Sequence, residues 1–173
     1  AFAELRSLMN ATHTDTTWRA RAFELMHQGH TRSPRRYKEQ WLPYLQSFPH
    51  HWRSFLRVVD SLEELGKACQ VAPFGRFFLR FWEGSGPYAV RPLLASPHLA
   101  SLGALSLSDG WIGPDGMRQL ANAPALSGLT HLYLASTNIQ DTGLKMLAES
   151  PYLQTLVHLG LKDTGLGSGA MRI

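Results

Sequence analysis

The stretch Leu129-Thr-His-Leu-Tyr-Leu-Ala-Ser-Thr-Asn-Ile139 decides the fold of this chain. Its Leu-x-Leu core alternates apolar and polar side chains, which predicts a short strand with one buried face. Residues 140–143 are turn formers, and we expect Asp141 to cap the helix that follows. Leu144, Leu147 and Ala148 recur at helical spacing, and Pro151 ends that helix. One strand, one turn and one helix are therefore predicted.

The same pattern occurs three times at a constant period. Its copies begin at Leu102, Leu129 and Leu156, and a half-copy precedes them at residues 93–99. Further apolar positions recur at constant offsets: Leu105, Leu132 and Leu159, then Leu107, Leu134 and Leu161, then Ile112, Ile139 and Leu166. Such a period indicates a solenoid, in which one supersecondary unit stacks on copies of itself.

A unit of this length and order resembles a leucine-rich repeat of the helix-backed, ribonuclease-inhibitor-like type. The resemblance covers about residues 90–173 and implies an α/β fold with a parallel sheet on a concave face and helices on a convex face. The family often has Asn where this chain has Gly110, Thr137 and Thr164. We expect the threonine hydroxyls to bond the neighbouring backbone there, less fully than Asn would.

The N-terminal part is predicted to be helical. A helix capped by Asp15 is expected to close at Gly29, and a second to start at Ser33-Pro34, with Pro43 disturbing it. The clearest amphipathic helix is expected over residues 54–69, and a strand at residues 77–81. The expected division is a helical N-terminal region and cap at 1–72 and a solenoid of three to four repeats at 73–173. This order is similar to bacterial leucine-rich repeat proteins with a short helical repeat-companion region.

Charge is unevenly distributed. The net charge is +4, and residues 1–60 hold nine Lys or Arg against five Asp or Glu, so they carry the whole excess. It is densest at residues 32–38. No apolar run approaches the roughly 20 residues of a membrane span. The single Cys69 excludes an internal disulfide framework and predicts a buried thiol and a cytoplasmic location.

These features favour a non-enzymatic protein-interaction module, a scaffold or accessory subunit with no cofactor. The alternation between buried leucines places the partner-binding side chains on the concave face, with Tyr133 at the centre. The predicted binding residues are Ser106, Ser108, His131, Tyr133, His158 and Lys162.

One other function competes with this interpretation. The alternative is an accessory subunit of a nucleoprotein complex that contacts nucleic acid, or an acidic partner, through Arg32, Arg35, Arg36 and Lys38. A metal site is not predicted: His131 and His158 should be neighbours, but two ligands are too few for structural zinc. No paired-carboxylate or Ser-His-Asp arrangement indicates an enzyme.

The third copy lacks the counterparts of Leu120, Ala121, Pro124 and Leu126, because its helix would begin near residues 170–171. Solenoids normally need capped ends. We therefore expect the C-terminal end to be covered by a second copy or a larger partner, or the native protein to be longer.

Overall fold

The centre of the protein is a five-stranded parallel sheet. The computed structural model describes residues 1–11, 17–47, 58–73, 75–81, 88 and 90–167. The strands lie side by side in their order along the chain. They are β1 (Val58–Val59), β2 (Phe77–Arg80), β3 (Leu102–Ser106), β4 (His131–Tyr133) and β5 (His158–Gly160).

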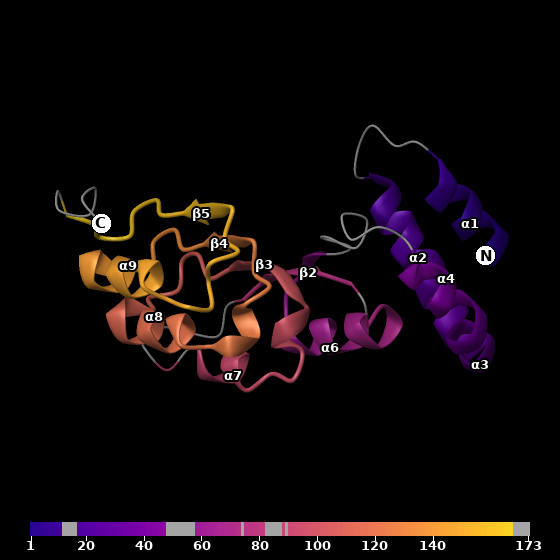
Figure 1. Cartoon of the computed structure of the whole chain (residues 1–173), viewed down its shortest axis with the longest axis horizontal. Coiled ribbons are helices and arrows are strands. Elements are labelled where there is room, and N and C mark those ends of the chain that lie inside the picture. Colours follow the sequence, from indigo (N-terminus) through magenta and orange to yellow (C-terminus); the bar gives the residue numbers. More distant parts are fainter. Residues whose placement is uncertain (12–16, 48–57, 74, 82–87, 89, 168–173) are drawn as a thin grey trace.

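A helix follows each of the first four strands. These helices are α6 (Leu62–Val71), α7 (Arg91–Leu94), α8 (Gly113–Ala121) and α9 (Gln140–Ala148), and they lie along one side of the sheet (Figure 1). Short 3₁₀ turns at Leu99–Ser101 and Pro124–Leu126 bring the chain back towards β3 and β4. The predicted strand, turn and helix order is confirmed, in a mixed α/β fold with an open sheet.

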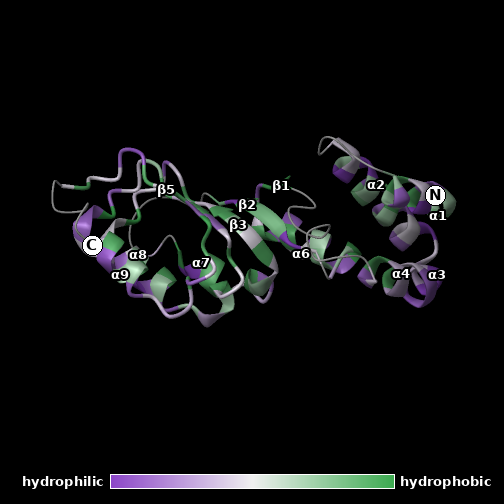
Figure 2. Ribbon diagram, turned by 45° about the horizontal axis from the view of Figure 1, so that its top comes forward, coloured by the Kyte–Doolittle hydropathy of each residue, from purple (hydrophilic) through white to green (hydrophobic). Residues whose placement is uncertain are grey.

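The repeat period sets the register of the last three strands. Ala104 on β3 pairs with His131 on β4, which pairs with His158 on β5. The next row holds Leu105, Leu132 and Leu159, of which the first two are buried against the helices. Figure 2 shows that β2 and β3 are predominantly hydrophobic. Burial of these leucines, worth about 2 kcal/mol each, holds the sheet on its helices.

The turns after the strands repeat as well. Residues at one position of each copy adopt the left-handed conformation, at φ 66°, 59° and 54°: Asp109, Ser136 and Asp163. The buried Thr137 hydroxyl donates to the Leu134 carbonyl at 2.5 Å, and Thr164 donates to Leu161 at 2.9 Å. The expectation that these threonines bond the neighbouring backbone is confirmed.

The prediction of a helix over residues 54–69 was wrong at the start of the helix. Residues 58–59 form strand β1, which pairs in parallel with β2, and α6 begins only at Leu62. Ser61 is the N-cap, and its hydroxyl accepts the Glu64 amide N–H, while the Glu64 carboxylate accepts the Asp60 N–H. This reciprocal capping and the β-branched valines stop the helix from extending further back. Residues 54–57 lie outside the described residues.

Helix α2 (Thr17–Arg32) does not close at Gly29 as expected, and it continues as far as Arg32. Gly29 is required by packing instead, because a Cβ there would overlap the Trp41 ring. Asp15, the expected cap, lies outside the described residues. The Asp141 prediction was also wrong: Ile139 is the N-cap of α9, and the Asp141 carboxylate accepts the Gly167 N–H at 2.8 Å. Asp141 thus joins two successive units.

The N-terminal helices pack on one another through apolar residues that continue into the core of the sheet. Ser33 precedes α3 (Pro34–Arg36), as expected, and a π-helical turn at Tyr37–Trp41 leads into α4 (Leu42–Gln46). This turn ends two residues before Pro43, near which the sequence predicts a disturbance. The residues expected on one face, Tyr37, Trp41 and Leu45, are all buried. Phe2 of α1 (Phe2–Asn10) stacks on Trp41 at 4.8 Å between ring centroids.

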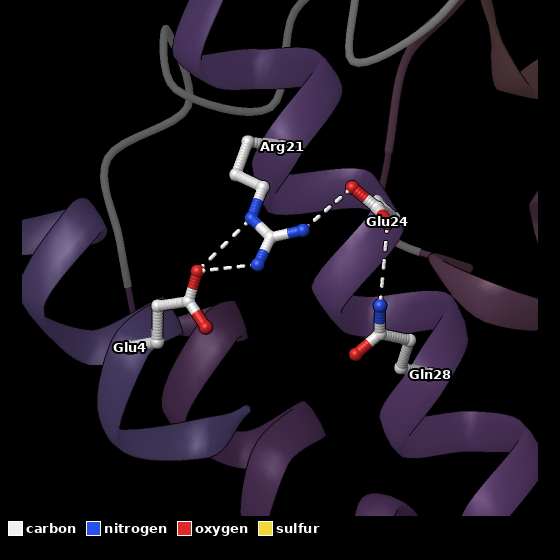
Figure 3. A network of polar contacts seen from close by, with 4 residues as sticks. All are labelled: Glu4, Arg21, Glu24 and Gln28. Atoms are coloured by element: carbon white, nitrogen blue, oxygen red, sulfur yellow. Dashed lines mark hydrogen bonds and ion pairs between the residues drawn. The ribbon is translucent and has the colours of Figure 1, made fainter.

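Polar contacts join α1 to α2. The Arg21 guanidinium binds Glu4 at 2.6 Å and Glu24 at 2.7 Å, and Gln28 donates to Glu24 (Figure 3). The hydrogen bond to Glu4 raises the pKa of Arg21 above its ordinary value. This part of the N-terminal positive charge is therefore neutralised locally.

The helical region meets the sheet at α6 and β2. The Tyr37 hydroxyl donates to the Val71 carbonyl, the last residue of α6, at 2.5 Å. Phe23 of α2 packs edge-on against Phe77 of β2 at 6.4 Å between ring centroids. The predicted division between residues 72 and 73 stays a prediction; strand β1, which lies before it, pairs with β2 in the sheet.

Replacing Tyr37 with Phe should lower the free energy of unfolding by about 1–2 kcal/mol at neutral pH, because the Val71 carbonyl loses a buried donor. Burial raises the pKa of Tyr37 above its ordinary value of 10.0. The unfolded chain therefore releases this proton first, and the contribution of Tyr37 to stability falls as pH rises above about 10. Urea unfolding measures the free energy of unfolding near neutral pH and above about pH 10. Between these two conditions, Tyr37→Phe should lose less stability than the unsubstituted protein. The exposed Tyr88→Phe is the control, and equal alkaline losses would contradict the expectation.

Candidate functional site

One face of the sheet carries side chains that no described helix covers. Leu79, Leu105 and Leu132 point into the core, so their neighbours along each strand point the other way. We call this second set the open sheet face. Its residues on β2 to β5 are Phe78, Arg80, Ala104, Ser106, His131, Tyr133, His158 and Gly160.

A continuous row of four rings crosses this face. Phe78 packs on Tyr133 with 5.6 Å between ring centroids, and Tyr133 packs on His158 with 5.0 Å. His158 stacks on His131 at 5.7 Å with an interplanar angle of 20°. Three strands therefore contribute to one aromatic surface, which we call the ring row.

The ring row spans β3 because that strand carries small residues. Two strand spacings separate β2 from β4, about 9.6 Å, yet the Phe78 and Tyr133 rings are much closer. They lean towards each other above β3, where Ala104 is only 2% exposed. A larger residue at this position would push the two rings apart.

Gly160 likewise leaves room for the Tyr133 ring, on the side of β5. A Cβ at Gly160 would lie 3.2 Å from Cδ1 of Tyr133, which is tighter than an ordinary contact. The Tyr133 ring therefore lies partly over β5 and next to His158. Ala104 and Gly160 together fix where Tyr133 stands.

The other predicted binding residues lie near the carboxyl ends of the strands. Ser106 pairs with Tyr133 in the sheet, and its hydroxyl lies 3.3 Å from that of Ser108. Lys162 lies just after β5 and is exposed, and its carbonyl accepts the Ser136 N–H at 2.9 Å. The structure thus brings His131, Tyr133 and His158 together and places the remaining three beside them.

The charge on the open sheet face is partly compensated. Arg80 binds Asp60, which directly follows β1, through two hydrogen bonds of 2.6 and 2.8 Å. Burial, followed by the neighbouring charge of His158, lowers the pKa of His131 below its ordinary value. The lowered pKa favours the uncharged form of the His131 imidazole.

Phe78 and Arg80 are absent from the residues predicted for this face. Alternate residues of a strand point to opposite faces, and Phe77 and Leu79 are fully buried. The alternation in Phe77-Phe78-Leu79-Arg80 could therefore have placed Phe78 and Arg80 on the open sheet face. The register, however, is irregular between Phe77 and Phe78, and Phe78 pairs with Ala104 at a sequence spacing one position shorter than that from Ala104 to His131. The strict repeat period therefore does not reach this strand.

The basic segment of the N-terminal region lies on the exposed side of α3 and the π-helical turn. Arg35 forms an ion pair with Glu39 at 2.9 Å, and the Arg36 guanidinium donates to Gln40 at 3.0 Å. Arg32 ends α2, and Lys38 is exposed. Two of these four residues thus already bind side chains of the same helical segment.

Other candidate chemistry takes structural roles. Cys69 is buried, and burial raises the pKa of its thiol. Gly165 has φ 74°, a left-handed conformation that suits glycine in a turn. Within the described ranges, no cluster of three or more His, Cys, Asp or Glu could hold a metal ion. Nor does any described helix combine the length and the apolar character that crossing a membrane requires.

Comparison with known proteins agrees with this architecture over one unit. A search of curated proteins found no match to the chain. Residues 128–148 match the family model described as Leucine Rich repeat. This segment holds β4, the turn after it and the whole of α9. The chain therefore contains a leucine-rich repeat.

Proposed function

We propose that this protein is a non-enzymatic interaction module that binds a protein partner through the open sheet face. The observation that carries the proposal is the ring row, in which Phe78, Tyr133, His158 and His131 form one aromatic surface. Aromatic side chains are enriched at the energetic centres of protein interfaces. Leucine-rich repeats commonly mediate such contacts, which supports this assignment.

The ring row is suited to binding because it is already ordered. Each ring packs against the next, and the leucines beneath β3 and β4 are fully buried. A partner would therefore meet side chains that lose little conformational entropy on binding. We propose a solenoid architecture of ribonuclease-inhibitor-like repeats for residues 73–173, with the helical region as its cap. We propose a role as scaffold or accessory subunit on the same grounds.

We expect Tyr133→Ala and His158→Ala each to reduce recovery of the protein partner at least about tenfold, because truncating a central aromatic residue costs about 1.4 kcal/mol or more. The measurement is affinity capture from the native source with the tagged 173-residue chain, followed by quantification of the captured protein. Tyr152→Ala, which alters the half-buried tyrosine that follows α9, is the matched control. Circular dichroism checks that each variant folds. If both sheet variants recover as much partner as the unsubstituted protein, the partner binds outside the open sheet face.

A further inference from the structure

A cavity of about 210 Å³ lies between helices α2 and α6. Residues three and four positions apart share one face of a helix, so each helix supplies one wall. The lining residues are Phe23 and His27 of α2, and Glu64, Lys67, Ala68 and Val71 of α6. Helix α6 lies with α7, α8 and α9 along one side of the sheet (Figure 1), so the cavity is separate from the ring row on the open sheet face.

The inner part of the cavity is apolar and already ordered. Phe23, Ala68 and Val71 are no more than 5% exposed. The Phe23 ring packs edge-on against Phe77, and the Tyr37 hydroxyl holds the Val71 carbonyl, so both walls are fixed. The hollow persists because the side chain of Ala68 ends at Cβ. An apolar cavity of about 150 Å³ can hold a benzene ring, so this one accommodates a six-membered ring with a short side arm.

The rim of the cavity is charged. The Lys67 ammonium is bound to the Glu63 carboxylate at 2.5 Å, so its charge is offset within α6. The Glu64 carboxylate accepts the Asp60 N–H at 3.0 Å and, within the described part of the chain, enters no ion pair. Glu64 therefore leaves a negative charge at the mouth of an apolar hollow, an arrangement that suits a cation attached to an apolar body.

We propose that this cavity binds a small aromatic ammonium compound, with its ring between Phe23 and Ala68 and its ammonium group at Glu64. This site is additional to the proposed function and does not depend on it. A buried aromatic ring packs favourably edge-to-face on another, and an ammonium group donates a charge-assisted hydrogen bond to a carboxylate. Glu64 is exposed, so its charge adds modestly to the affinity. Burial of the ring supplies most of the binding, and the carboxylate selects the cation.

The test compares three ligands of nearly equal shape: phenethylamine, phenethyl alcohol and phenylpropionate. Each is titrated into the isotopically labelled 173-residue chain at low ionic strength and about pH 8, above the range in which histidine titrates. The backbone amide signals of His27, Lys67 and Ala68 report binding. We expect the dissociation constant of the amine to be at least about threefold lower than that of the alcohol. Phenylpropionate should bind most weakly, because Glu64 repels its carboxylate.

Three variants decide whether this cavity is responsible. Glu64→Gln keeps an oxygen that can accept the Asp60 N–H but removes the charge, so the amine should bind no more tightly than the alcohol. Glu149→Gln, which changes an exposed carboxylate just after α9, should retain the preference for the amine. Ala68→Leu fills the hollow and should abolish binding of both ligands, with circular dichroism checking that the variant folds.

Three results would overturn the proposal. The first is that the amide signals of α2 and α6 do not respond to phenethylamine. The second is that phenethyl alcohol or phenylpropionate binds as tightly as the amine. The third is that the preference for the amine persists in Glu64→Gln, a comparison that decides even if Ala68→Leu fails to fold.

Discussion

Replacing Leu132 with Ala should lower the free energy of unfolding by about 2–5 kcal/mol, among the largest effects expected from a single substitution in this chain. Leu132 lies at the centre of β4, is 1% exposed, and has in-register leucines on both sides at Leu105 and Leu159. Truncation leaves a cavity that rigid neighbouring strands can fill only in part. Urea unfolding followed by circular dichroism measures the loss.

Leu159→Ala is the matched control, because it removes the same side chain from the same position one unit later. Leu159 is only half-buried, so we expect a loss of about 1 kcal/mol in the 173-residue chain. The difference between the two variants measures what stacking a further unit contributes. Equal losses would contradict the burial difference on which this expectation depends.

The repeat could be predicted because, in a stacked sheet, the number of residues per repeat decides which residues of neighbouring strands pair. The constant spacing from Ala104 to His131 and from His131 to His158 puts these residues side by side whatever the details of the turns. The left-handed residues of the turns follow the same spacing. Contact between His131 and His158 is therefore a consequence of sequence alone.

The start of the sheet could not be predicted in the same way. The sequence spacing between paired residues is one position shorter between β2 and β3 than in the repeats, and it is shorter still between Val58 and Phe78. The valines of β1 also fit the apolar spacing of the following helix, so periodicity does not separate strand from helix there. Only the Ser61–Glu64 capping contacts mark the boundary.

The candidate site was predicted in its parts but not in its continuity. Alternation places His131, Tyr133 and His158 on one face. No sequence pattern, however, predicts how far an aromatic side chain tilts towards a neighbouring strand. The row depends on the small side chains of Ala104 and Gly160, whose effect is visible only once neighbouring strands are in place. Side-chain packing across strands, rather than local propensity, decides this surface.

Gly29 shows how a glycine can be misread as a helix end. This buried glycine lies inside the last turn of α2 because the Trp41 ring occupies the space of a Cβ. Trp41 is itself fixed between Phe2, stacked at 4.8 Å, and Tyr37, at 5.4 Å. The ring has no room to move away, so a methyl group at residue 29 forces a shift of the helices.

We therefore expect Gly29→Ala to lower the free energy of unfolding by about 1–3 kcal/mol through overpacking, despite a gain in helix propensity of about 1 kcal/mol. Gly66→Ala is the matched control in α6, where the new Cβ would meet the His98 ring at an ordinary 3.5 Å. That variant should gain up to about 1 kcal/mol, because propensity acts there without a clash. Urea unfolding of both variants gives changes of opposite sign if packing against Trp41 determines residue 29. A stabilised Gly29→Ala would mean that α2 and the π-helical turn are held together less tightly than these contacts require.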